Sequence, residues 1–265
     1  MKKNWRDKMK KMDLVIFPLD LGTLVSFDQS IFTLLRNQGV KIDAPCLAWV
    51  ILGGGKKVLV DTGPPEPDWA YRYHRPIKKE PSQEIHTALE KLGLSPQDID
   101  IVIFSHLHWD HSFNLDHFSK ATFLVQKAEL KYAVNPLPSD KKPYAVGISG
   151  VQPPWMKVFG QMIPLDGDQE ILPGIRVMHL PGHTPGAQGV VVETSEGPWV
   201  IAGDTVPLYE NWKGDDTLDH IPGGVFQNLY DYYFSLKKLE PFGDKILPSH
   251  DEKVLKHKRY PVSGG

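Results

Sequence analysis

The sequence has a single cysteine, no marked excess of charge of either sign and no long apolar run. Cys46 alone cannot form an intramolecular disulfide, and a thiolate metal site would have only this one sulfur to use. The net charge of −2 provides no basic field for nucleic acid or for anionic lipid. No stretch reaches the ~20 apolar residues that are needed to span a bilayer. These absences predict a cytoplasmic protein whose partners include neither nucleic acid nor a membrane.

The first eleven residues, MKKNWRDKMKK, carry six basic side chains and could be taken for the charged part of an export signal. The segment that follows, MDLVIFPLDLG, is apolar only briefly, because Pro18 and Asp20 interrupt it. We therefore expect residues 1–12 to form a disordered basic N-terminus.

Glycine and proline, 23 of each, separate the rest of the chain into many short elements. The expected strands lie within 13–22, 46–63, 98–105, 121–126, 174–186, 189–194, 198–204 and 244–251. The expected helices are 82–94, with Ser82 as its N-cap, 127–134 and 225–241. Residues 64–81 and 135–165 are rich in proline and are expected to be irregular. Strands that form hairpins and also alternate with helices predict mixed sheets covered by helices, in one domain over residues 1–265.

Histidine and aspartate follow four of the expected strands, each at its C-terminal end. His106, His108, Asp110 and His111 lie in SHLHWDH, and the other three are His183, Asp204 and His250. In an extended segment, residues two apart point to the same side, so His106 and His108 can meet at one ion while Leu107 points to the core. If a helix begins near Asp110, then Asp110 and His111 turn toward a second ion.

Seven candidate ligands are too many for one four-coordinate metal and about right for two metals that share a carboxylate. Imidazole and carboxylate predict two divalent metal ions, zinc first, with iron, manganese or cobalt as alternatives.

The motif HLHWDH resembles the H-x-H-x-D-H signature of the metallo-β-lactamase superfamily. Four further motifs of that superfamily follow the expected order: VDTG at 60–63, LPGHTPG at 180–186, IAGDT at 201–205 and PSHD at 248–251. The resemblance implies a four-layer αβ/βα sandwich with mixed sheets and a dinuclear metal centre at one edge. It also implies the individual roles: one metal held by His106, His108 and His183, the other by Asp110, His111 and His250, Asp204 as the bridge, and Asp61 as the group that orients a ligand histidine.

The segments VDTGPPEP, LPGHTPGAQGVVVET and PSHDEKV are most similar to the N-acyl homoserine lactonase group of this superfamily. The resemblance implies a hydrolase that opens a small lactone or related ester through a metal-bridging hydroxide, with Asp110 carrying a proton to the leaving group. Pro207 stands where those lactonases have a tyrosine, and Tyr209 is the candidate to replace it. This departure leaves the exact substrate open.

Several aromatic side chains are candidates for the wall of the substrate pocket, although packing alone is the simpler explanation for each of those in the irregular segments. The candidates are Trp109 in the histidine motif, Tyr209, Trp69, Trp155 and Phe226, with Tyr71 and Tyr73 beside Trp69. By family analogy, the N-terminal strands and residues 135–165 could mediate a homodimer.

Three alternatives stay open. A thioesterase or an aryl or alkyl esterase similar to glyoxalase II is one, but only about fifteen residues follow His250, where glyoxalase II has a helical region. The second is an iron-dependent redox protein on the same fold. The third is a binding protein that keeps its metals for stability alone.

Overall fold

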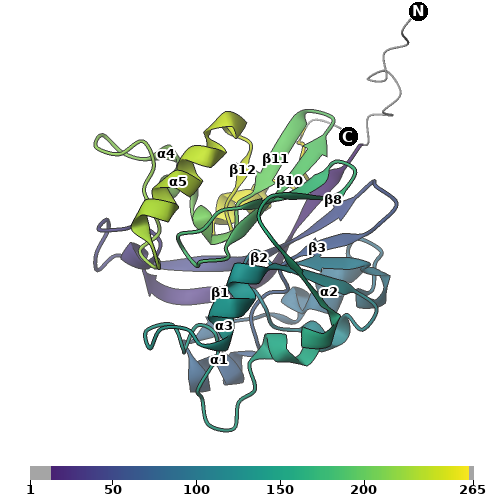
Figure 1. Cartoon of the computed structure of the whole chain (residues 1–265), viewed down its shortest axis with the longest axis horizontal. Coiled ribbons are helices and arrows are strands. Elements are labelled where there is room, and N and C mark those ends of the chain that lie inside the picture. Colours follow the sequence, from purple (N-terminus) through teal and green to yellow (C-terminus); the bar gives the residue numbers. More distant parts are fainter. Residues whose placement is uncertain (1–12, 263–265) are drawn as a thin grey trace, which may run out of the picture.

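The computed structural model describes residues 13–262, and its core consists of two mixed β-sheets that face each other (Figure 1). Across the first sheet the strands are β4 (Ile77–Lys78), β1 (Val15–Asp28), β2 (Lys41–Leu52), β3 (Val58–Val60), β5 (Ile101–Ile103), β6 (Thr122–Gln126) and β7 (Met162–Leu165). Across the second they are β12 (Ile246–Leu247), β11 (Gly197–Ile201), β10 (Gln188–Thr194), β9 (Ile175–His179) and β8 (Gln169–Leu172). Both sheets contain parallel and antiparallel pairs, so the predicted mixed-sheet αβ/βα sandwich is confirmed.

Alternation along the strands separates two apolar layers. In β2, Leu47, Trp49 and Ile51 point between the sheets, where they meet residues of β9 and β10, while Ala48 and Val50 point the other way. With both faces covered, the central part of β2 is buried at every position, as is typical of a strand inside a layered fold.

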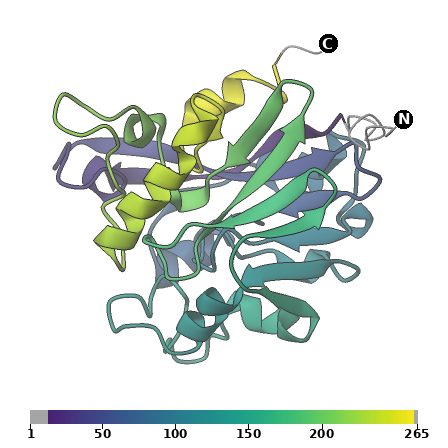
Figure 2. The same ribbon diagram turned by 45° about the horizontal axis from the view of Figure 1, so that its top comes forward.

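Helices cover the outer faces of both sheets. On the first sheet they are α1 (Pro67–Tyr73), α2 (Ile85–Glu90) and α3 (Lys127–Val134), and on the second they are α4 (Tyr209–Lys213) and α5 (Leu229–Leu239). Figure 2 shows α5 lying along the second sheet, where Tyr232, Leu236 and Leu239 are buried against the strands. No helix among residues 13–262 is long and apolar enough to cross a membrane.

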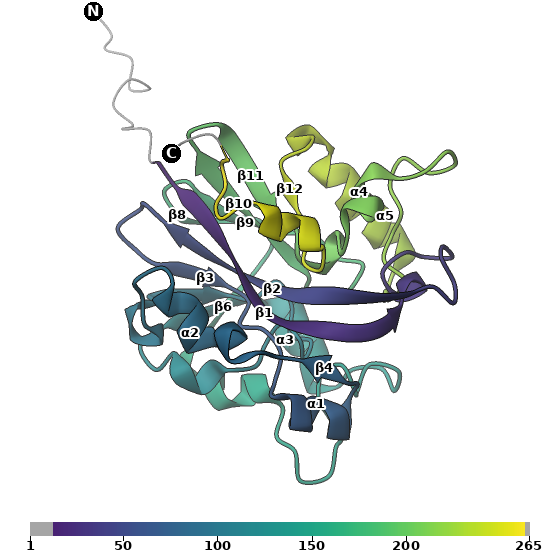
Figure 3. The ribbon, with the colours of Figure 1, turned by 180° about the vertical axis from the view of Figure 1, so that it is seen from behind.

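The far end of the β1–β2 hairpin reaches the segment between α4 and α5 (Figure 3). Backbone hydrogen bonds join Leu34 to Pro222 and Gly224 to Ile31, and the Asn211 side chain donates to the carbonyl of Phe32 at 2.6 Å. The turn at this end of the hairpin is therefore joined to α4 and the segment that follows it, next to the edge that carries the histidines.

Several element boundaries differ from those predicted. The helix expected at 82–94 covers only Ile85–Glu90, because Pro81 and a capping box between Glu80 and Gln83 make a separate 3₁₀ turn; the N-cap is Glu84, so the prediction of Ser82 was wrong. The segments expected to be irregular contain α1, β4, β7 and a 3₁₀ helix at Pro154–Gln161. The helix expected from residue 225 begins at Leu229, after the capping side chain of Asn228.

The predicted disorder of residues 1–12 lies outside the described residues. The assignment of residues 1–265 to a single domain stays a prediction.

Candidate metal centre

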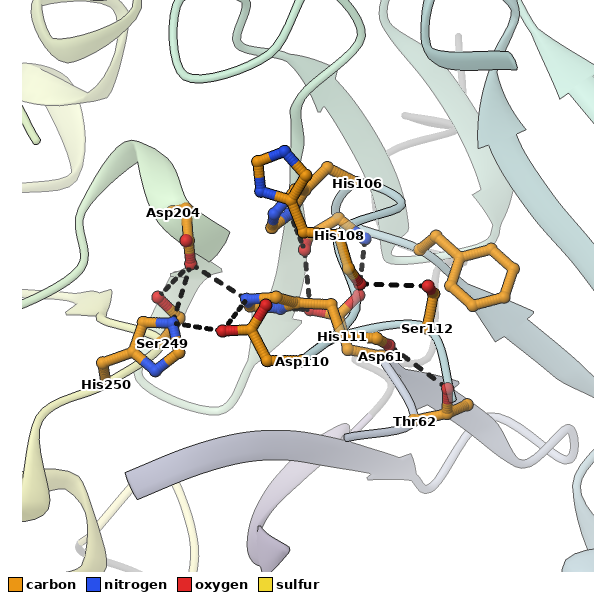
Figure 4. Close-up of polar contacts among 12 residues, drawn as sticks. Asp61, Thr62, His106, His108, Asp110, His111, Ser112, Asp204, Ser249 and His250 are labelled. Atoms are coloured by element: carbon orange, nitrogen blue, oxygen red, sulfur yellow. Dashed lines mark hydrogen bonds and ion pairs between the residues drawn. The ribbon is translucent and has the colours of Figure 1, made fainter. Parts of the chain in front are cut away.

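Four loops at one edge of the two sheets bring the seven predicted ligands together, and Figure 4 labels all of them except His183. The loop after β5 contributes four of them, and the loops after β9, β11 and β12 contribute one each. No helix begins at Asp110; a turn over residues 109–111 redirects the chain instead, with the amide of His111 donating to the carbonyl of His108 at 3.0 Å. Leu107 is buried in the core, as the alternation predicts.

The first group consists of His106, His108 and His183, whose ligand atoms lie within 4.8 Å of one another. All three rings are buried, and His183 Nε2 lies 3.1 Å from His108 Nδ1. Burial, reinforced by the neighbouring imidazoles, holds the pKa of His106 and of His108 well below its ordinary value. These two rings are therefore neutral, which is the form that binds a metal ion.

The second group surrounds Asp204. Its Oδ1 lies 3.2 Å from Nε2 of His111 and 3.2 Å from Nε2 of His250, whereas its Oδ2 lies 3.4 Å from Nε2 of His183. Oδ2 of Asp110 is farther away, at 3.9 Å from His111 and 3.8 Å from His250. One carboxylate thus faces both groups of histidines with different oxygen atoms, which is the orientation that a bridging ligand requires.

Nearby carboxylates determine the pKa of the two histidines of the second group, His111 and His250. Burial lowers the pKa of His111, but the charges of Asp204, Asp110 and Asp61 outweigh it and raise that pKa well above its ordinary value. His250 follows the same pattern, with burial opposed by Asp204, and its pKa is raised. Divalent cations would take the place of these protons, because both balance the same carboxylate charge.

Hydrogen-bond partners hold most of the rings with Nε2 directed at the centre. In each of four histidines, Nδ1 lies within hydrogen-bond distance of an oxygen atom outside the ligand set. These pairs are His106 with Ser105 Oγ (3.1 Å), His111 with Asp61 Oδ2 (2.9 Å), His183 with the Val225 carbonyl (2.9 Å) and His250 with the Pro45 carbonyl (2.8 Å). Among residues 13–262, the buried Nε2 of His106 has no hydrogen-bond partner. A buried nitrogen left in this state fits a metal ligand better than a packing residue.

Asp61 lies at the end of β3, where the structure places it against His111. Its carboxylate accepts hydrogen bonds from the Ser105 amide at 2.7 Å and the Ser105 hydroxyl at 2.6 Å, and its backbone is left-handed, with φ of 59°. The same carboxylate therefore holds the ring of His111 and the first residue of the histidine loop.

Glu129 was not predicted to belong to the site; it lies in the first turn of α3 and is completely buried. Its Oε1 accepts from the Leu107 amide (2.9 Å) and the Tyr144 hydroxyl (2.6 Å), and its Oε2 accepts from the Thr184 hydroxyl (2.7 Å) and the Gly186 amide (3.1 Å). Glu129 thus joins the loop of His106 to the loop of His183. A glutamate in a short amphipathic helix is ordinarily exposed, and no pattern in the neighbouring residues indicates otherwise.

Cys46 is the other residue whose place was not predicted. It is buried on β2, and its sulfur and the ligand atoms of Asp110 and His250 all lie within 4.8 Å of one another. The backbone of Pro45, its neighbour, approaches His250, so the pairing of β2 with the rest of the first sheet determines this position.

A cavity of about 330 Å³ opens over the centre. Of the aromatic residues predicted to contact substrate, only Trp109 lines it. The ring of Trp109 stacks on His74 at 4.6 Å, and Trp69 lies behind His74 at 5.4 Å, one layer away from the cavity.

The structure corrects the expectation for the other three aromatic residues. Trp155 is only 3% exposed in the core beneath the first sheet, and Phe226 packs beside α5. Tyr209 begins α4 and packs against the layer between the sheets, so it does not take the place left by Pro207, which itself lines the cavity. The hydrophobic effect draws these rings against the apolar layers and away from the cavity.

Five histidines and two aspartates at the edge of two facing mixed sheets define a metal-dependent hydrolase. The chain belongs to the metallo-beta-lactamase superfamily, whose profile matches residues 42–250, most of its length.

The chain is similar to an N-acyl homoserine lactonase of a Bacillus species, with 27% identity over 198 residues that cover 71% of this chain and 74% of that protein. Two solved structures share its fold. An N-acyl homoserine lactone hydrolase with N-hexanoyl-L-homoserine at its catalytic metal centre has a TM-score of 0.73 at 23% identity, covering 91% of this chain and 95% of the other. AidC, a dizinc quorum-quenching lactonase, has a TM-score of 0.68 at 18% identity, and the match covers 96% of this chain and 90% of AidC.

Proposed function

We propose that this protein hydrolyses a lactone or a related ester with the help of two divalent metal ions. The observation that supports this most directly is the carboxylate of Asp204, which turns one oxygen atom to His183 and the other to His111 and His250. The similarity to N-acyl homoserine lactonases favours a lactone over other esters.

In this proposal His106, His108 and His183 would hold one metal ion, and Asp110, His111 and His250 would hold the other. Asp204 would be a ligand available to both. Zinc is the metal that we propose, with iron, manganese or cobalt as alternatives, because imidazole and carboxylate suit all of them and AidC is a dizinc enzyme. When bound, two such ions polarise a carbonyl group and make water a nucleophile near neutral pH.

The side chains of the cavity contribute the remaining chemistry. Asp110 lines the cavity, so its carboxylate is the group that we propose to carry a proton to the departing alkoxide. Leu24, Phe27 and Phe32 form an apolar wall that excludes water and can pack against the hydrocarbon part of a substrate. Trp109 limits the width of the approach to the metals.

The test combines metal analysis with a substrate panel. We expect about two first-row metals per chain and hydrolysis of γ- or δ-lactones, with little activity on matched thioesters and aryl esters. Asp110→Asn should lower kcat by a factor of about 10² or more while fold and metal content are retained. Asp216→Asn, at an exposed position that does not line the cavity, serves as the control.

Metal-loaded protein that cleaves thioesters or aryl esters but no lactone would refute the lactonase proposal and favour the esterase alternative. Full activity without metal would refute the hydrolase mechanism as a whole. A homodimer and a cytoplasmic location stay predictions from the sequence.

A further inference from the structure

The lining of the cavity over the metal centre contains two kinds of residue. Leu24, Phe27, Ile31 and Phe32 are apolar and come from the end of β1 and the turn that follows it. The cations Arg75 and Lys142 come from the segment after α1 and from the segment between α3 and β7.

Contacts within the protein hold both cations in place. The guanidinium of Arg75 lies 5.0 Å above the ring of Phe27, and Lys142 Nζ donates a hydrogen bond to the carbonyl of His74 at 3.1 Å. His74 lines the same cavity, and burial followed by the charges of Lys142 and Arg75 lowers the pKa of its ring to about 3. Within residues 13–262, neither cation forms an ion pair with a carboxylate.

The carboxylates that line the cavity are not available to pair with these cations. Its lining contains two carboxylates, Asp110 and Asp204, and both face the histidines of the centre. Metal ions bound there would add positive charge. Arg75 and Lys142, which are solvent-exposed residues of the cavity lining, are therefore left without a carboxylate partner, and two cations at one cavity attract an anion.

We propose that the substrate carries an anionic group, such as a carboxylate, at a distance from the carbonyl that reacts, and that Arg75 and Lys142 bind this group. The inference rests on the proposed hydrolysis of a lactone or ester at the same cavity. The hydrocarbon that connects the two ends of such a substrate would pack on Phe27 and the apolar residues beside it.

The experiment uses two pairs of probes that differ in a single terminal group. The first pair is N-hexanoyl-homoserine lactone and N-adipoyl-homoserine lactone, in which a carboxylate replaces the terminal methyl. The second pair is the corresponding lactams, which are not hydrolysed and report binding alone by calorimetry with the metal-loaded protein. We expect the carboxylate member of each pair to be favoured by about tenfold, in kcat/KM for the lactones and in Kd for the lactams.

The double variant Arg75→Gln/Lys142→Gln should reduce both ratios to near one, and 0.5 M salt should weaken them in the wild-type protein. The matched control is Arg72→Gln/Lys141→Gln, which changes two exposed neighbours that do not line the cavity and should leave both ratios unchanged.

Equal affinity of the wild-type protein for the two lactams, or a preference that survives in the double variant, would overturn the inference. Preference for the anionic lactam without hydrolysis of either lactone would instead count against the proposed lactonase activity and leave the anion site standing. The two ideas can therefore fail separately.

Discussion

Replacement of Glu129 by glutamine tests whether one buried carboxylate holds the metal-ligand loops together. Glu129 accepts four hydrogen bonds, two on each oxygen atom, from the loops that carry His106 and His183 and from Tyr144. The substitution keeps the size of the side chain and removes only its negative charge and one of its two hydrogen-bond-accepting oxygen atoms.

The magnitude follows from the two backbone donors. The amide of glutamine has one oxygen atom that accepts and one NH₂ group that donates. In one orientation the NH₂ group faces the N–H of Leu107, and in the other it faces the N–H of Gly186, so one of these two backbone donors always loses its acceptor. A hydrogen bond to a charged group contributes about 1.5–3 kcal/mol, and a buried donor without an acceptor costs about 1–3 kcal/mol. We expect the Glu129→Gln variant to lose about 3 kcal/mol in the free energy of unfolding. Its affinity for zinc should fall by about tenfold, since the ligand loops lose their common support.

Urea unfolding of the metal-free proteins measures the first quantity, and competition with a chromophoric chelator measures the second. Glu90→Gln, at an exposed position at the end of α2, is the control and should be close to wild type in both. A Glu129→Gln variant within about 0.5 kcal/mol of wild type and with unchanged zinc affinity would refute the role assigned to this carboxylate.

Three further predictions follow from the same region. Gly186→Ala would put a Cβ 2.1 Å from the amide nitrogen of Glu129 and should lower the free energy of unfolding in urea by about 3 kcal/mol. Gly160→Ala is the control, because open space surrounds Gly160, and it should change that free energy little. Equal losses in the two variants would contradict the close approach of Gly186 to Glu129. Burial lowers the pKa of His74 from its ordinary value of 6.5 to about 3 in the folded protein. As the pH falls from 6.5 toward 3, the imidazole is therefore protonated in the unfolded chain before it is protonated in the folded protein, and the free energy of unfolding decreases. His74→Phe, which keeps the stacking on Trp109, should show a smaller loss of melting temperature over that range, and identical pH profiles would argue against the shift. Removal of metal with a chelator should lower the melting temperature by several degrees, because binding energy is available only to the folded protein; an unchanged midpoint would mean that the histidine cluster holds no metal.

Most of the strands could be predicted because their signal is local, whereas β4, β7 and β8 were not predicted. Short apolar runs such as residues 189–194 lie between turn-forming residues, and each run contains its own evidence for a strand. Helix ends were predicted less well. The start of α2 depends on a competing turn at Pro81–Gln83, which the apolar spacing of the helix does not reveal.

Residue type and spacing determined the candidate ligands without any knowledge of the tertiary structure. Imidazole and carboxylate side chains follow four separate strands, and the two-residue step from His106 to His108 is a property of the backbone itself. The sequence could not rank the aromatic residues, since burial depends on what packs against each ring. Trp109 lies at the cavity and Trp155 in the core, although both come from irregular segments.

Only the tertiary structure decided what surrounds the ligands. Glu129 meets Leu107 across 22 positions of the chain and Thr184 across 55, and Arg75 and Lys142 reach one cavity from segments on either side of the histidine loop. Spacing along the sequence carries information about neighbours within a strand or a helical turn, whereas these contacts arise when distant elements pack together. The sequence by itself therefore determined which residues could bind metals, and the packing of the two sheets decided what holds those residues and which charges face the space above them.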